Sequence, residues 1–146
     1  MPAANTFKTA LINHILANAA VANVGDAGGL QPSATAGSLY IALHTADPGV
    51  AGSQTTSEAT YTGYARVAVT RAGSSWTVGT GTFSNASSIT FPAATAGTNT
   101  VTYFSIGTAA SGTGELLLTD ALTSSLAVSA GISPSFAVGA LSGTVS

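Results

Sequence analysis

Two short segments of alternating apolar residues, joined by a polar loop, constrain the fold of this chain more than any other feature. In residues 39–43, Leu39, Ile41 and Leu43 fall on one face of an extended chain, and residues 64–69 alternate in the same way. A period of two is typical of a β-strand with one buried face. The two segments therefore predict a β-framework with an ordered loop.

The chain that follows consists of further short strand candidates, separated by turns rich in Gly, Ser, Thr and Asn. The candidates lie at residues 76–78, 81–83, 88–91, 100–106, 115–119, 125–129, 136–138 and 141–145. Many short strands at this spacing are typical of a sandwich or a jelly roll. We therefore predict a mainly β fold, with a sandwich or jelly-roll-like domain over residues 34–146.

The N-terminal residues follow the period of an α-helix instead. Their apolar side chains form a stripe with helical spacing, made of Phe7, Leu11, Ile12, Ile15, Leu16 and Ala19. The pattern predicts one amphipathic helix of about four turns that ends before Gly25, with Asn5 or Thr6 as its N-cap. A Gly-rich link completes this N-terminal segment, residues 1–33. We expect the mature chain to retain the helix, because polar residues interrupt the apolar region that a signal peptide requires.

The sequence leaves two uses for this helix open. It either covers an open edge or end of the β-domain, or it docks as an arm on a neighbouring subunit. The second use makes Phe7, Leu11 and Ile15 candidate interface residues.

Charged residues are scarce throughout the chain. Lys and Arg number three and Asp and Glu five, which is 5% of all residues, whereas ordinary soluble domains carry about 25%. A surface of short uncharged side chains loses little rotamer entropy when another protein covers it. The composition therefore favours a surface that partners cover over one adapted to exposure and protease resistance.

Composition also argues against several classes of function. Three cations at a net charge of −2 cannot form the basic stripe that binds a nucleic acid backbone. The chain lacks the run of about 18 apolar residues that would predict a membrane span. It has no cysteine, so neither disulfides nor a thiolate metal site can form.

His44 and Asp47 are the residues that most resemble a catalytic pair. A chain so rich in Ser and Thr will place some hydroxyl near them, so this proximity does not indicate a triad. Asp47 precedes Pro48 and Gly49, which predicts an Asx-type turn bond from Asp47, with His44 hydrogen-bonded locally. We interpret these residues as a structural loop, and predict no catalytic, cofactor or metal site.

Arg66 stands out because it lies within a predicted strand of a chain that has almost no cations. A guanidinium in such a place usually has a carboxylate partner. Glu58 and Asp47 in the adjoining loop are the expected partners inside the domain. The alternative is a salt bridge to a neighbouring subunit, which makes Arg66 a further candidate interface residue.

Several sequence motifs resemble those of a known family. The run LYIALHTADPG is followed by Glu58, by YTGYARVAV and by Trp76, and weaker similarity continues through FPAAT, YFSIGTAASG and ISPSFAVGAL. On these motifs the chain resembles a family of small tailed-bacteriophage virion proteins, which often carry the label tail fiber protein. Many members are better explained as capsid-associated proteins. The motifs are a structural signature and not a chemical one.

The resemblance implies a non-enzymatic structural protein of the virion. Our first interpretation is a capsid decoration or cement protein on the capsid exterior, assembled in the host bacterial cytoplasm. Its partners would be the major capsid protein and further copies of itself, as a homo-oligomer that bridges capsomers. The alternative is a tail-fibre or receptor-binding module that recognises a host surface glycan or protein. Neither Gly-X-Y repeats nor heptads occur, so the chain cannot build a fibre shaft alone.

Overall fold

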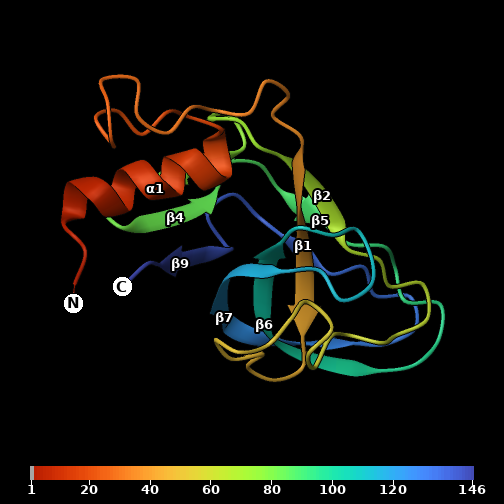
Figure 1. Ribbon diagram of the computed structural model, residues 1–146. Coiled ribbons are helices and arrows are strands. Elements are labelled where there is room, and N and C mark those ends of the chain that lie inside the picture. The colour runs from red at the N-terminus through yellow and green to blue at the C-terminus, as the bar shows by residue number, and fades with distance from the viewer. Residues whose placement is uncertain (1) are drawn as a thin grey trace.

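The fold is built from short antiparallel strands and one N-terminal helix (Figure 1). The computed structural model describes residues 2–146. Its elements are α1 (Asn5–Ala17), β1 (Ser38–His44), β2 (Val67–Thr70), β3 (Trp76–Val78), β4 (Thr82–Asn85), β5 (Ile89–Thr90), β6 (Asn99–Gly107), β7 (Leu116–Val128), β8 (Ser135–Phe136) and β9 (Ser142–Thr144). The predicted fold class, a mainly β sandwich-like domain with one N-terminal helix, is confirmed.

The strands form one larger sheet and two smaller ones. The main sheet has the order β2-β1-β6-β7, a second has the order β3-β4-β9, and β5 pairs with β8. Strand β7 is one strand where the sequence predicted two, because a bulge interrupts its register with β6 near Thr102 without ending the pairing. Strand β2 begins only at Val67, later than predicted.

Helix α1 packs on the β-domain of its own chain. Ile12 and Leu16 are buried in the same core cluster as Ile41 and Phe104 of the main sheet, and Figure 1 shows α1 lying along β4. Among the residues that the structure describes, no helix is long and apolar enough to cross a membrane.

The ends of α1 differ from the predicted ones in one respect. The N-cap is Ala4, which offers no side-chain hydrogen bond, so the predicted cap at Asn5 or Thr6 is wrong. The helix ends at Ala17, and its C-cap, Asn18, adopts the left-handed conformation at φ 53°. The Asn18 amide then donates to the Ser33 carbonyl at 2.9 Å and accepts from the Ser33 N–H at 2.8 Å, which folds the Gly-rich segment back beside the helix.

Strand β1 lies inside the main sheet and is buried on both faces. Leu39, Ile41 and Leu43 point into the core, as their alternation predicted. Ala42 and His44, on the opposite face, are also buried. We call this opposite side the outer face of the sheet. The loop of residues 45–58 reaches it through Gln54 and Thr56, which bond to β1.

Candidate functional site

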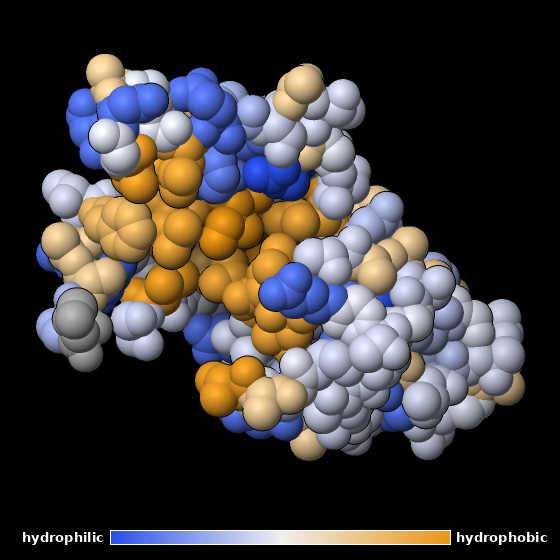
Figure 2. All heavy atoms as spheres, viewed as in Figure 1, coloured by the Kyte–Doolittle hydropathy of each residue, from blue (hydrophilic) through white to orange (hydrophobic). Residues whose placement is uncertain are grey.

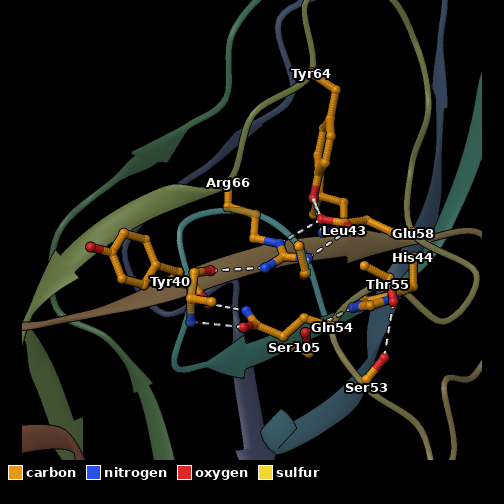
Figure 3. Close-up of polar contacts among 12 residues, drawn as sticks. Tyr40, Leu43, His44, Ser53, Gln54, Thr55, Glu58, Tyr64, Arg66 and Ser105 are labelled. Carbon is orange, nitrogen blue, oxygen red and sulfur yellow. Dashed lines mark hydrogen bonds and ion pairs between the residues drawn. The ribbon is translucent and has the colours of Figure 1, made fainter. Parts of the chain in front are cut away.

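A cluster of polar side chains holds the loops above the outer face together (Figure 3). Arg66 donates from Nε to Glu58 Oε1 at 2.7 Å and from Nη2 to Glu58 Oε2 at 2.8 Å, a bidentate ion pair. Tyr64 donates its hydroxyl to the same carboxylate at 2.9 Å and accepts from the Leu43 N–H at 3.0 Å. We call Glu58, Tyr64 and Arg66 the polar clasp.

The clasp also reaches the connection between β6 and β7. Arg66 donates to the carbonyl of Ala109 at 2.8 Å and to that of Gly112 at 2.7 Å. The side chain of Arg66 is only 2% exposed, and its hydrogen bond to Glu58 raises the pKa of the guanidinium. Burial likewise raises the pKa of Tyr64. Of the two carboxylates predicted as partners of Arg66, the structure selects Glu58, while a role for Arg66 at an interface stays a prediction.

Gln54 is a residue of this cluster that the sequence did not single out. Its side chain is fully buried; it donates to the Tyr40 carbonyl at 3.2 Å and accepts from the Ala109 N–H at 2.9 Å. It fills a slot that exists because Gly107 lacks a side chain, since a Cβ there would lie 2.1 Å from the Gln54 amide carbon. Gln54 therefore joins the loop of residues 45–58 to β1 and to the segment after β6. Its side chain fills the space above Gly107.

His44 is fully buried beneath the same loop. Its Nδ1 lies 2.8 Å from the carbonyl of Thr56 and its Nε2 lies 2.8 Å from the hydroxyl of Ser105. A carbonyl only accepts, so Nδ1 carries the hydrogen and Nε2 accepts from Ser105. Burial lowers the pKa of His44, although the Thr56 bond and the charge of Glu58 oppose the shift.

This arrangement does not have the geometry of a nucleophilic triad. The group that orients His44 is a backbone carbonyl and not a carboxylate, and Ser105 is as fully buried as His44. Its bond to Ser105 crosses to β6, so His44 is less local in its contacts than predicted. Its chemical role here is to fasten the loop of residues 45–58 to the sheet.

Asp47 makes the turn that the sequence predicted. Its Oδ1 accepts from the Gly49 N–H at 2.8 Å, the bond of an Asx turn, and Pro48 between them is buried. No group of three or more His, Cys, Asp or Glu residues able to hold a metal ion occurs within residues 2–146.

A second candidate site is apolar and lies on α1. Phe7 is 44% exposed, and Leu11 and Ile15 are half-buried, in contrast to the buried Ile12 and Leu16. We call Phe7, Leu11 and Ile15 the helix face. Figure 2 shows hydrophobic atoms gathered over α1 and continuing toward β7. The apolar stripe of the helix therefore divides into two parts. One part packs in the core, and the other is open to solvent.

Comparison with known protein families gives a match over almost the whole chain. The family model described as Podophage GP4 fiber I protein gp80 matches residues 2–144. No curated protein matches the chain.

Proposed function

Because the chain belongs to the family of podophage GP4 fiber I protein gp80, we propose that it is a non-enzymatic structural module of a phage fibre. Membership of this family makes it a bacteriophage structural protein of the virion. The chain has neither repeats nor heptads for a shaft, so within a fibre it forms a base, collar or tip.

The observation that carries this proposal is the contrast between satisfied polar groups and an open apolar face. The charged and polar side chains of the clasp bond one another and the carbonyls of Ala109 and Gly112, which leaves them little capacity for chemistry on a substrate. The helix face instead leaves apolar area in water. Covering such area stabilises an assembly by about 25 cal/mol per Å², so it suits attachment to a neighbouring virion protein.

A capsid decoration protein is the second candidate, and the low charge of the chain favours it. With 5% charged residues, the molecule is suited to having much of its surface covered, as a protein that bridges capsomers would. Its partner in that case is the major capsid protein. The family description names a fibre, and for that reason we rank the fibre first.

Copy number and adsorption separate the two candidates. Quantitative mass spectrometry of purified particles, referenced to the portal protein, would count the copies of this chain. A fibre module is expected in tens of copies or fewer, and the purified protein or an antibody against it should reduce phage adsorption if it lies at the tip. Hundreds of copies with unchanged adsorption would replace the fibre assignment with capsid decoration.

A further inference from the structure

A groove crosses one end of the main sheet, next to the helix face. Each strand of the sheet contributes to it in turn, from Arg71 directly after β2, through Leu39 in β1 and Thr108 directly after β6, to Leu117 in β7. Ile15 and His14 of α1, together with Ala36 and Ser38, complete the lining of a space of about 350 Å³. The lining is mixed, and its apolar side chains extend the helix face toward β7, across the hydrophobic area that Figure 2 shows between α1 and β7.

Arg71 supplies a positive charge at the β2 edge of this groove. Its guanidinium donates to the carbonyls of Ile15 and His14, both at 2.7 Å, and at 3.3 Å to the Ala36 carbonyl and the Ser33 hydroxyl. All four acceptors are neutral oxygens. Among residues 2–146 the structure has one ion pair, that of Arg66 with Glu58. No carboxylate of the described chain therefore pairs with the charge of Arg71.

Glu115 supplies a negative charge at the opposite edge. Its backbone holds it beside the groove, because Thr108 N–H donates to the Glu115 carbonyl at 3.1 Å and Glu115 N–H donates to the Thr108 hydroxyl at 3.0 Å. Glu115 is exposed. Neighbouring strands lie about 4.8 Å apart, so the three spacings from β2 to β7 place the backbones of the two residues roughly 14 Å apart across the sheet.

This pattern is complementary to itself. A two-fold axis through the middle of the groove brings the Arg71 edge of one copy to the Glu115 edge of the other, twice, because each residue of an isologous interface meets its counterpart reciprocally. The apolar side chains between the charges, Ile15 and Leu117, then cover each other. We propose that the groove and the helix face together form the interface of a homodimer of this chain.

A stable dimer would cover only a small share of the surface of this chain. A specific interface buries about 800 Å² on each partner, which is about a tenth of the 7157 Å² accessible surface of this chain. Two opposite charges at the rim fix the register of the two copies, while the apolar centre supplies most of the affinity. The proposal does not depend on whether the dimer serves a fibre or a capsid.

Analytical ultracentrifugation of the purified chain tests the proposal first. Over concentrations from about 1 to 300 μM the protein should pass from monomer to a species of twice its mass, and the dimer should weaken in 1 M NaCl because the rim charges are screened. A protein that stays monomeric throughout this range would overturn the proposal and leave the face to a different virion protein. Closed trimers would also overturn it, because they lack a two-fold axis.

Charge reversal then tests the register. Glu115→Lys places two like charges together at each end and should raise the dimer Kd by about tenfold or more. The double variant Glu115→Lys, Arg71→Glu restores opposite charges and should recover most of the affinity. Val50→Lys is the matched control, since it adds a cation at a side chain that is 105% exposed and outside the groove.

Arg71 also holds the end of α1, so each variant is first checked for the wild-type circular dichroism spectrum. If the double variant does not fold, Glu115→Lys carries the test with Glu115→Gln, which should give an intermediate Kd. A Kd for Glu115→Lys within twofold of the Val50→Lys control would overturn the pairing of Arg71 with Glu115.

Discussion

The outer face of the main sheet and the side covered by α1 differ in whether their side chains find partners within the chain. On the outer face, Arg66, Glu58, Gln54 and His44 all bond within the chain. On the helix side, Phe7 and its neighbours leave apolar area open. The outer face therefore completes its own hydrogen bonding, in keeping with a scaffold, whereas the helix side leaves apolar area that we propose a partner covers.

The largest expected effect comes from breaking the polar clasp. Arg66→Met leaves the partly buried carboxylate of Glu58 without its counter-charge, and removing one partner of a buried ion pair costs about 3–5 kcal/mol. We expect the free energy of unfolding in urea to fall by that amount. The double variant Arg66→Met, Glu58→Leu should recover part of the loss, because no buried charge is then left unpaired.

Lys8→Met is the control for this experiment, since the ammonium of Lys8 makes no hydrogen bond within residues 2–146. If Arg66→Met unfolds at the same urea concentration as Lys8→Met, while its binding to particles weakens, Arg66 belongs to an interface and the scaffold assignment of the outer face is wrong.

A smaller effect is expected where Gln54 fills its slot. Gly107→Ala forces a methyl group against the buried amide, and overpacking of this kind costs about 1–3 kcal/mol. Gly73→Ala is the matched control, because a Cβ there meets nothing within 4 Å. In a Gln54→Ala background, Gly107→Ala should cost less than in the wild type. Equal urea stabilities of Gly107→Ala and Gly73→Ala would contradict the close packing.

Acid should loosen the outer face through His44. Its pKa in the folded chain lies below 6.5, so the unfolded chain binds more protons in that range. The stability from His44 is therefore present above pH 6.5 and is lost as pH falls from 6.5 through the folded pKa, at up to about 1.4 kcal/mol per pH unit. Burial dominates this shift, while the charges of Glu58, Arg66 and Asp47 modify it.

Urea unfolding at pH 7.5, 6.5 and 5.5 measures this dependence. The variant His44→Gln keeps the carboxylates but lacks the imidazole, so the difference between the two proteins gives the contribution of His44. The wild type should lose more stability than His44→Gln between pH 6.5 and 5.5. Parallel losses in the two proteins would show that His44 does not couple the loop to pH.

The smallest effect on stability is expected on the helix face. Phe7→Ser should change the free energy of unfolding by about 0.5 kcal/mol or less, because the side chain is largely exposed. Ile12→Ala, five residues along the same helix and buried, should cost about 2–5 kcal/mol. A loss for Phe7→Ser as large as that for Ile12→Ala would mean that the helix face is part of the core and not a docking surface.

Much of the fold was predictable because it depends on local patterns. Alternation located most strands, and Asp47 with Pro48 and Gly49 identified the turn. The start of α1 was mispredicted because tertiary packing of Ile12 and Leu16, rather than a cap, stabilises it. The sequence predicted two strands at residues 115–119 and 125–129, but a bulge absorbs the residues between them and β7 continues.

The candidate site was less predictable, because its contacts join residues far apart in the sequence. Glu58 could be proposed for Arg66 since only two carboxylates lie nearby. Gln54 had no signal, because one polar residue in a polar loop does not reveal a slot formed by Gly107. Likewise, helical periodicity marked Phe7 and Ile12 as one stripe but could not say which side chains the core would bury.

A cryo-EM reconstruction of the intact particle tests most directly the claim that the helix side is the binding surface. We predict density for this chain in a fibre, with the helix face and the neighbouring groove covered by another chain and the loop of residues 45–58 in solvent. Density in which α1 faces solvent while residues 45–58 are covered would contradict the claim.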